Sequence, residues 1–354
     1  MVNMEQLKCF NELNLMTSHI DDYKDVHSIM IKEINPQIIP KISFVIPTMG
    51  RSKLLREALD SILRQKSIVK YEIVIVDNSA DYADKMIYSY LEGIKTCRVR
   101  YYINQKNIGM TGNFNRCVAL ADSEWVAMLH DDDLLADWYL EDMVRYIHVA
   151  TQYSNRVGMI MPQKVKFYDK KIPNVCKNEE VFLSRYTKKD TLITGIGPSN
   201  GPTCGFVVNK KAFYDVGGYN PLFYPSHDHV LGFQMQAFGY LTYKTSDVLG
   251  FYRIEMNASM KKETFLQMHE ADSVFLDYLL TKKENVLYKV FFENAQYSLR
   301  IKECITTAKS YMINDLSIGE LDFKNKYKIY PVHFKLIIFL RKVANRIRKK
   351  IKIE

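Results

Sequence analysis

Apolar stretches rich in β-branched and aromatic residues alternate with helix-like stretches in the first part of the chain. Residues 42–46, 73–76, 99–103 and 125–129 have the composition of strands. The segments between them, at residues 52–63, 84–92 and 112–121, have the pattern of helices. This order predicts parallel strands that are joined by crossover helices, in a sheet covered by helices on both faces. The predicted fold class is therefore α/β.

Polar residues follow each of the four predicted strands. They are Pro47-Thr48, Asp77-Asn78, residues 104–109 and residues 131–133. In sheets of this kind, ligands bind outside the carboxyl ends of the strands. Four polar segments that meet at one edge of the sheet predict a binding site there.

The last of these segments is a run of three aspartates, Asp131, Asp132 and Asp133, directly after an apolar strand. Three like charges at a strand end are unfavourable unless a cation lies beside them. Mg²⁺ and Mn²⁺ prefer carboxylate oxygens, and Mg²⁺ usually keeps coordination positions for water and substrate phosphates. The run therefore predicts a metal-and-phosphate site. The alternative is a solvated acidic turn that caps the next helix.

The order of these segments resembles the family 2 glycosyltransferases of GT-A fold, of the type that builds bacterial surface polysaccharides. The resemblance covers residues 41–260 and rests on residues 45–48, 75–78, 107–109, 129–133, 205–208, 213–219 and 251–253, with Asn113, Asn115, His227, Asp228, Asn257 and Ser259. It implies a nucleotide-diphospho-sugar transferase fold, in which helices flank a mixed, mostly parallel sheet and a helical extension follows. It also implies a nucleotide-sugar donor, UDP- or dTDP-linked, and a saccharide or lipid-linked saccharide acceptor.

The resemblance also implies which residues contact the nucleotide sugar. Pro47 and Thr48 line the nucleotide pocket, and Asp77 contacts the base. A carboxylate can accept a hydrogen bond from the imide N–H of uracil or thymine, although a turn or helix-cap role for Asp77 is the alternative. Arg51 can grip a phosphate with two hydrogen bonds, or it is an ordinary surface arginine. The other implied nucleotide-sugar residues are Asn107, Gly109, Asn113, His130 and Asp131.

The acidic run matches the family's Asp-any-Asp-Asp pattern in two registers. In the favoured one, His130 takes the first position, Asp132 binds the metal and Asp133 follows it. In the other, Asp131 and Asp133 flank Asp132 as the metal-binding pair. Glu255 stands where many relatives place a histidine near the metal, and a glutamate can also bind a hard cation. The expected cofactor is Mn²⁺ or Mg²⁺.

Asp228 is the predicted general base, because it matches the second residue of the family's acidic pair. A carboxylate within hydrogen-bond reach of the acceptor hydroxyl can take its proton. His227 replaces the expected first acid, and His227 or His229 is an alternative base. A helix-cap role is the alternative for Asp228. One base and one displacement imply inversion at the anomeric carbon.

Composition narrows the class of protein. A chain of 354 residues suffices for one large domain with an appended segment. The six cysteines show no metal-ligand spacing, and Cys9 stands far from the others, so a reduced, cytoplasmic protein is expected. Residues 1–16 mix charged with apolar residues, unlike a signal peptide, and no apolar run has the length of a membrane span.

The C-terminal segment is basic and amphipathic. Its apolar residues are three or four apart and include Leu336, Leu340, Val343, Ile347 and Ile351. Its basic residues are Lys335, Arg341, Lys342, Arg346, Arg348, Lys349, Lys350 and Lys352. Such a helix predicts adhesion to anionic lipid, on the inner face of the plasma membrane. The alternatives are a dimerisation helix, and hence a homodimer, or a terminal helix packed on the rest of the chain. Nucleic acid is not expected as a partner, because the rest of the chain is nearly neutral.

These observations divide the chain into four regions. They are a helical N-terminal extension (1–40), a GT-A domain (41–262) with a nucleotide-binding half (41–135) and an acceptor half (136–262), a helical region (263–330) and the basic tail (331–354). The expected function is a metal-dependent inverting glycosyltransferase. The alternatives are a nucleotidyltransferase and a catalytically degenerate sugar-nucleotide-binding scaffold, which the departures at His227 and Glu255 favour.

Overall fold

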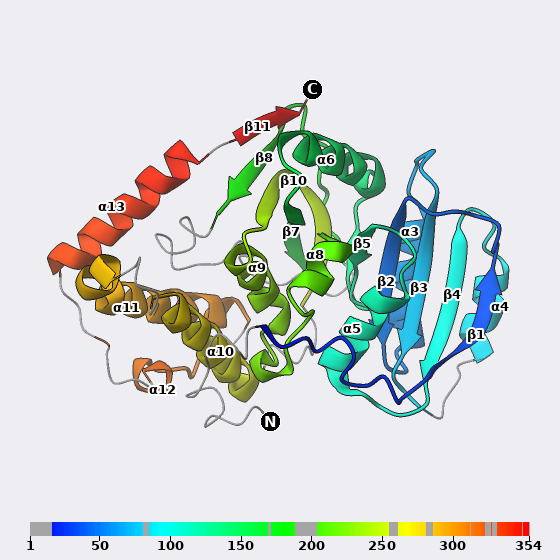
Figure 1. Cartoon of the computed structure of the whole chain (residues 1–354), viewed down its shortest axis with the longest axis horizontal. Helices are drawn as coiled ribbons and strands as arrows, with labels where there is room; N and C mark the ends of the chain where they lie inside the picture. The colour runs from blue at the N-terminus through cyan, green and yellow to red at the C-terminus, as the bar shows by residue number, and fades with distance from the viewer. Residues whose placement is uncertain are drawn as a thin grey trace.

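A central mixed sheet, helices on both of its faces and a helical region at one end make up the protein (Figure 1). The computed structural model describes residues 16–80, 85–168, 171–187, 204–254, 261–280, 286–311, 313–322, 327, 331–348 and 350–353. The strands are β1 (Ser28–Ile34), β2 (Ile42–Thr48), β3 (Tyr71–Asp77), β4 (Arg98–Asn104), β5 (Trp125–Met128), β6 (Leu134–Leu135), β7 (Val157–Phe167), β8 (Val181–Tyr186), β9 (Phe206–Asn209), β10 (Leu241–Arg253) and β11 (Lys350–Ile353). The helices are α3 (Ser52–Leu63), α4 (Lys85–Glu92), α5 (Gly109–Leu120), α6 (Tyr139–Tyr153), α8 (Lys210–Asp215), the 3-10 turn η1 (Pro221–Phe223), α9 (His227–Ala237), α10 (Lys262–Leu280), α11 (Val286–Ser310), α12 (Ile318–Leu321) and α13 (Pro331–Ile347).

The four predicted strands form one half of the sheet. They are β2, β3, β4 and β5, and they pair in parallel in the order β4-β3-β2-β5. Helices α3, α4 and α5 connect them, as the sequence predicted. The predicted parallel arrangement with crossover helices is therefore confirmed.

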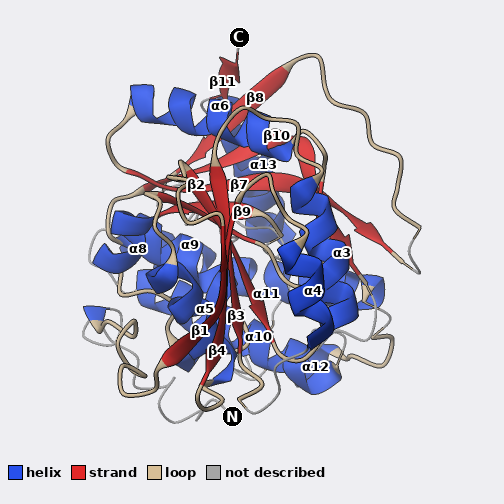
Figure 2. Cartoon of the chain, turned by 90° about the vertical axis from the view of Figure 1, so that its right-hand side faces the viewer, coloured by secondary structure: helices blue, strands red, loops and turns tan. Residues whose placement is uncertain are grey.

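Alternate residues of the strands enter two different cores. On β2, Phe44 and Ile46 pack into the core that includes Leu55 and Leu59 of α3. Val45 points to the other face and packs into the core that includes Phe114 of α5. Viewed along its plane, the sheet has α3 and α4 on one side and α5, α8 and α9 on the other (Figure 2). Both faces are covered, which explains why these strands are apolar throughout.

The second half of the sheet adds antiparallel pairs. β9 lies antiparallel between β5 and β7, and β10 pairs in parallel with β7. The short strand β6 pairs with the end of β10, which brings Leu134 opposite Phe251. This pairing holds the segment after the acidic run against the far half of the sheet.

The N-terminal region corrects one prediction. Residues 28–34 were expected within a helical extension, but they form strand β1, which pairs antiparallel with β4 at one edge of the sheet. The segment contains the β-branched residues Ile29, Ile31 and Ile34, which favour a strand. Pairing with β4 also satisfies the backbone groups of what would otherwise be an open edge.

The C-terminal tail corrects a second prediction in part. A helix is present, but it ends at Ile347, and residues 350–353 form strand β11 against β8. Here Ile351 and Ile353 are buried while Lys350 and Lys352 are exposed. That alternation has the period of a strand, two residues, which the helical interpretation overlooked. Among the described helices, none is both long and apolar enough to cross a membrane.

Candidate functional site

A cavity of about 1050 Å³ opens at the carboxyl ends of β2 and β3 and reaches the helices α9, α10 and α11. Most of the predicted site residues line it: Pro47, Thr48, Arg51, Asn107, Gly109, Asn113, His130, Asp131, Asp132, His227 and Asp228. The cavity thus joins the nucleotide half and the acceptor half that the sequence predicted. Asp77 and Asp133 are buried and are not among its lining residues. Glu255, Asn257 and Ser259 lie outside the described residues.

A network of asparagine side chains shapes the nucleotide end of the cavity. Asn78 donates from Nδ2 to Oδ1 of Asn107 over 2.8 Å, and its own Oδ1 accepts from Nδ2 of Asn104 over 3.0 Å. Asn104 also donates to Oδ1 of Asn113 over 2.9 Å. Gly109 begins α5 with a φ of +71°, which favours glycine. Asn107, Gly109 and Asn113 were predicted from the sequence, whereas the role of Asn78 and Asn104 in holding them was not.

Asp77 is engaged within its own loop. Its Oδ1 accepts from the backbone N–H of Ser79 over 3.0 Å, and its Oδ2 accepts from the hydroxyl of Tyr101 over 2.8 Å. The first contact is the turn role that the sequence left open as an alternative. Since each carboxylate oxygen can accept a second hydrogen bond, base recognition by Asp77 stays a prediction.

Two aspartates of the acidic run, Asp131 and Asp132, contact Arg51. Asp131 accepts from the hydroxyl of Thr48 over 2.6 Å and from Nε of Arg51 over 3.0 Å. Asp132 accepts from Nη1 of Arg51 over 3.0 Å. Burial raises the pKa of Asp131, although the Arg51 guanidinium works against that rise. Arg51 is therefore the cation of the acidic run in this structure, and its side chain is half exposed to the cavity.

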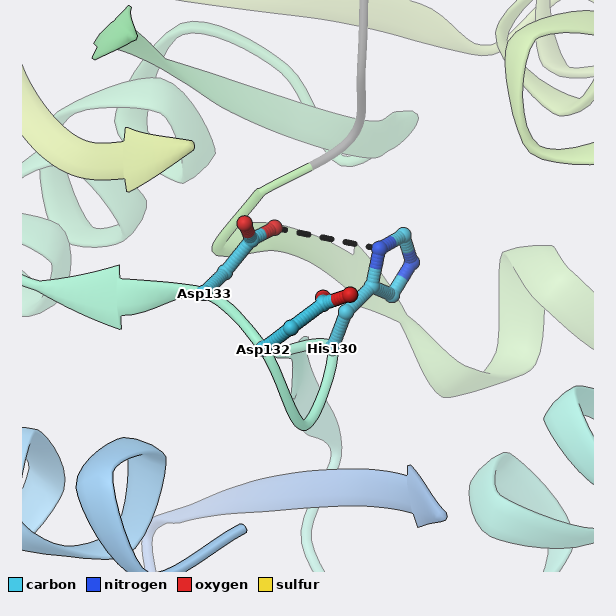
Figure 3. Close-up of side chains that lie close together, drawn as sticks. All are labelled: His130, Asp132 and Asp133. Atoms are coloured by element: carbon cyan, nitrogen blue, oxygen red, sulfur yellow. Dashed lines mark ion pairs between the residues drawn. The ribbon is translucent and has the colours of Figure 1, made fainter. Parts of the chain in front are cut away.

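His130, Asp132 and Asp133 form a separate cluster (Figure 3). Their candidate ligand atoms lie within 4.8 Å of one another, and Nδ1 of His130 is 3.8 Å from Oδ2 of Asp133. Among the described residues, neither Nε2 of His130 nor Oδ2 of Asp133 has a hydrogen-bond partner, although both atoms are buried. Burial raises the pKa of Asp133 well above its usual range, and the Asp132 carboxylate adds to that rise. Buried carboxylates normally have a partner, so this cluster has the chemistry of a cation site.

Arg253 anchors the acidic run to β10. Its backbone N–H donates to Oδ1 of Asp133 over 3.0 Å, and its Nε donates to the backbone carbonyl of Asp132 over 2.7 Å. Its Nη2 reaches Oε2 of Glu57 on α3 over 2.6 Å. The Arg253 side chain is almost wholly buried, at 1% exposure. In the sequence, Arg253 belonged to the segment 251–253 of the family resemblance, and nothing there indicated these contacts.

Helix α9 presents the acceptor-side residues. Its N-cap is Ser226, so Asp228 lies in the first turn and is not the cap residue. Oδ1 of Asp228 accepts from the backbone N–H of His229 over 2.8 Å, and the half-buried carboxylate lines the cavity. Burial lowers the pKa of His227 to about 4, so its imidazole is neutral at pH 7. Among the described residues, the buried Nε2 of His227 has no hydrogen-bond partner.

A buried ionic network ties α9 to the C-terminal helices. Nδ1 of His229 lies 2.9 Å from Oδ2 of Asp272 on α10, and Nη2 of Arg300 on α11 lies 2.8 Å from the same oxygen. The hydroxyl of Ser226 donates to Oδ1 of Asp272 over 2.6 Å. His229 is therefore paired with Asp272. No motif in the sequence indicated this pairing, because the partners are far apart along the chain.

Comparison with known proteins gives the same picture. Residues 43–217 match the family described as glycosyl transferase family 2. The chain is 27% identical over 187 residues to the GalNAc(5)-diNAcBac-PP-undecaprenol beta-1,3-glucosyltransferase of Campylobacter jejuni. That match covers 52% of this chain and 57% of the Campylobacter enzyme, so the chain spans little more than half of its relative's length.

Two solved structures share the fold. The crystal structure of S. aureus TarS 1-349 in complex with UDP-GlcNAc has a TM-score of 0.53 and 12% identity, and the match covers 86% of this chain and 92% of the TarS 1-349 chain. The mannosyltransferase PcManGT of Pyrobaculum calidifontis, in complex with GDP-Man and Mn²⁺, has a TM-score of 0.52 and 15% identity, with 88% of both chains covered. At these identities the likeness concerns the fold alone, and it confirms the predicted GT-A fold.

Proposed function

Because this chain belongs to glycosyl transferase family 2, we propose that it transfers a sugar, with inversion, from a nucleotide-sugar donor to a saccharide or lipid-linked saccharide acceptor. One observation carries this proposal. Asp131 and Asp132 of the acidic run line the same cavity as Asp228, and we assign them to its nucleotide side and its acceptor side. A transfer reaction needs the donor site and the acceptor site in one cavity, because the acceptor oxygen must reach the sugar carbon from which the diphosphate departs.

His130, Asp132 and Asp133 fit a divalent metal, Mn²⁺ or Mg²⁺. The fit rests on the buried atoms without a partner in this cluster and on the hard carboxylate oxygens that it offers. When bound, the ion neutralises charge on the phosphate oxygens as the bond to the sugar breaks. The arrangement favours the register that pairs Asp132 with Asp133, since Asp131 contacts Thr48 and Arg51 instead. Glu255 remains a candidate further ligand.

The nucleotide end is assigned to the pocket wall formed by Pro47, Thr48, Asn107, Gly109 and Asn113. Arg51 lies between this wall and the acidic run, where its guanidinium can bind the donor's diphosphate with two hydrogen bonds. Asp77 is the candidate for contact with uracil or thymine. TarS in its complex binds UDP-GlcNAc and PcManGT binds GDP-Man, so these two structures with this fold hold different nucleotide classes.

Asp228 is the proposed general base. The proton of the acceptor hydroxyl moves to the Asp228 carboxylate while the acceptor oxygen bonds to the anomeric carbon and the nucleoside diphosphate leaves. A single displacement of this kind inverts the anomeric centre. His227 is the weaker candidate for the base. A histidine is usually more basic than an aspartate, but burial lowers the pKa of His227 to about 4 and removes that advantage. We assign its Nε2, which has no partner among the described residues, a hydrogen bond to a substrate hydroxyl.

Two further proposals concern surroundings. The named acceptor of the Campylobacter relative is linked to undecaprenol by PP, which supports a lipid-linked acceptor and a role in surface polysaccharide synthesis here. Helix α13 supports adhesion to the inner face of the plasma membrane. Val332, Leu336 and Phe339 are 75%, 41% and 60% exposed, and they lie at spacings of four and three. Exposed Lys335, Lys342 and Arg346 accompany them.

The test is binding and turnover with a panel of sugar nucleotides. Thermal shifts are measured with Mn²⁺ and then with EDTA, for the wild type, Asp132→Asn and the matched surface variant Asp137→Asn. We expect one nucleotide class to raise the melting temperature with Mn²⁺ only, in the wild type and in Asp137→Asn but not in Asp132→Asn. The Asp228→Asn variant should keep that shift and lose transfer. No shift with any nucleotide at saturating metal would refute the proposal.

A further inference from the structure

The cavity lining includes three lysines from the second half of the sheet. Lys164 and Lys166 come from β7, and Lys244 comes from β10 beside it. Lys164 and Lys166 are two residues apart on a strand, so their side chains leave the same face. The adjacent strands β7 and β10 lie near α9 (Figure 1).

Only one of these lysines has a partner in the described part of the chain. Nζ of Lys166 donates to the hydroxyl of Ser310 over 2.8 Å and lies 4.0 Å from the centre of the Tyr311 ring. Lys164 and Lys244, the lysine pair, make no side-chain hydrogen bond or ion pair with any residue that the structure describes.

Three buried arginines in the described part of the chain are paired, whereas the partly buried lysine pair is not. Arg100 contacts Glu72 over 2.7 Å, Arg253 contacts Glu57 over 2.6 Å and Arg300 contacts Asp272 over 2.8 Å. Even partial removal of a lysine ammonium group from water is unfavourable when it has no partner.

Electrostatics add to this cost. Burial lowers the pKa of Lys164 to about 8, and the nearby charge of Lys244 contributes to the lowering. Burial also lowers the pKa of Lys244, with a contribution from Arg348. Asp133 and Asp228 act on Lys164 in the opposite sense. Asp133 belongs to the proposed metal cluster, so a bound cation would weaken the stabilisation that Asp133 gives to the charged Lys164. An anion beside Lys164 would then replace that stabilisation.

The position of the lysine pair indicates which substrate supplies the anion. Lys164 lies within electrostatic reach of Asp228, the proposed base, and of Asp133. Because both lysines line the same cavity as Asp228, an anion that they hold can belong to the substrate whose hydroxyl faces this base. The donor's diphosphate has a different cation available, Arg51, at the nucleotide end.

We propose that Lys164 and Lys244 form a subsite for a negatively charged oxygen group, phosphate or carboxylate, on the acceptor. The proposal rests on the proposed function, because it takes the Asp228 side of the cavity as the acceptor side. It selects an anionic acceptor, such as a saccharide phosphate, a pyrophosphate-linked saccharide or an acidic sugar, over a neutral saccharide. The lysine pair holds the anion and thereby positions the neighbouring hydroxyl against Asp228.

The first test measures binding of small anions to the full chain by calorimetry, in EDTA so that no metal bridges the anion to the aspartates. Inorganic phosphate and glucuronate are the probes, and glucose is the neutral control. The variants are Lys164→Met, Lys244→Met and the matched Lys70→Met, an exposed lysine directly before β3, at the other end of the strands. Methionine keeps the length of the side chain, and melting temperatures verify that each variant is folded.

We expect at least one anion to bind the wild type and Lys70→Met alike, and to bind each lysine-pair variant at least about tenfold more weakly. The stronger of phosphate and glucuronate then identifies the class of acceptor group. Equal anion binding in all variants, or no anion binding to the wild type, overturns the proposal.

A second measurement separates the acceptor from the donor. The affinity for UDP with Mn²⁺ should be unchanged in Lys164→Met and Lys244→Met. A tenfold loss of UDP affinity in these variants would assign the lysine pair to the donor's diphosphate and overturn the acceptor subsite. If no nucleotide of the donor panel binds while the lysine pair still binds an anion, the donor proposal fails and the anion site remains, so the two failures can be told apart.

Discussion

Nη1 of Arg51 donates a hydrogen bond to Oδ2 of Asp132 over 3.0 Å, and Asp132 is also a member of the cluster proposed to hold the metal. One carboxylate therefore serves a side-chain cation here and would serve a metal ion in the active enzyme. The two cations compete for the same charge, so the guanidinium should weaken metal binding until a donor diphosphate draws it away.

We predict that Arg51→Gln has opposite effects on metal and nucleotide. Without nucleotide, Mn²⁺ should bind more tightly because the competing guanidinium is gone. The affinity for UDP should fall about tenfold, because charge-assisted hydrogen bonds to phosphate are lost. Calorimetric titrations of Mn²⁺ and of UDP check both effects, with Arg64→Gln as the control, an exposed arginine paired with Asp137. Unchanged Mn²⁺ affinity in Arg51→Gln would show that the two cations do not compete.

The register of the acidic run can be decided by single amide substitutions. Asp132→Asn and Asp133→Asn should each reduce Mn²⁺ affinity by at least tenfold, since both carboxylates belong to the cluster with His130. Asp131→Asn should keep most of the metal affinity, because Asp131 contacts Thr48 and Arg51. Mn²⁺ electron paramagnetic resonance measures all three variants. A loss in Asp131→Asn equal to that in Asp132→Asn would favour the other register.

Arg253 should contribute strongly to stability. It is buried at 1% exposure and joins three parts of the chain, Glu57 on α3, the acidic run and β10. Arg253→Met leaves Glu57 and the Asp132 carbonyl without this donor, so we expect the free energy of unfolding to fall by about 3 kcal/mol. The half-exposed control Arg64→Met should cost less than about 1 kcal/mol. Urea unfolding measures both, and equal losses would mean that the buried network adds nothing.

The pairing of His229 with Asp272 predicts how stability depends on pH. Burial works to lower the pKa of His229, but the Asp272 carboxylate outweighs it and raises that pKa above 6.5. Burial works to raise the pKa of Asp272, but the charges of His229 and Arg300 outweigh it and lower that pKa to about 2. A raised histidine pKa stabilises the fold fully below pH 6.5, and the contribution is lost as the pH rises through the folded value. The contribution of Asp272 is present above pH 3.8 and is lost as the pH falls towards 2.

We therefore expect a steeper loss of stability above pH 6.5 in the wild type than in His229→Gln. The groups around His229 are Asp272, Arg300, Asp228 and Ser226. Carboxylates, arginine and serine do not ordinarily change charge near neutral pH, so the change in this range belongs to His229. Urea unfolding at a series of pH values from 5.5 to about 8.5 gives the two profiles. Parallel profiles would show that His229 is not charged in the folded protein.

The nucleotide half was predicted from local patterns, and that explains its success. Strand, helix and strand-end polarity are all encoded within short windows, so the positions of Thr48, Asn78 and the acidic run at one edge followed from the sequence order alone. The predicted pairing is seen directly where Thr48 lies opposite Asp77 at the ends of β2 and β3.

Contacts between distant segments could not be predicted in the same way. Asp272 contacts His229 from helix α10, although it lies 43 residues later in the chain. Arg253 reaches back to Glu57, and Lys164 on β7 lies within electrostatic reach of Asp228 on α9. None of these relations has a spacing or composition that marks it. In strand β11, by contrast, the signal was present in the alternation of Ile351 and Ile353 with lysines, and the helical interpretation masked it.

The exposed face of α13 provides the last prediction, on membrane adhesion. The opposite face of this helix is occupied, because Ile337 packs with Ala295 and Leu299 of α11. Deletion of the whole tail would uncover that core and also remove β11 from β8, so it cannot isolate a membrane role. Substitutions on the exposed face avoid both effects.

We expect the double variant Leu336→Gln and Phe339→Gln to bind anionic vesicles at least about tenfold more weakly than the wild type, because two apolar side chains no longer enter the lipid interface. Binding of the wild type should also weaken at high salt, since Lys335, Lys342 and Arg346 add attraction to anionic lipid. Sedimentation with vesicles of phosphatidylglycerol and phosphatidylcholine measures both. The exposed double variant Ile29→Gln and Met30→Gln on β1 is the matched control and should sediment like the wild type. If all three proteins sediment equally, α13 is not the membrane anchor. Its exposed apolar residues would then be candidates for contact with a second copy of the chain, and the oligomeric state in solution would test that contact.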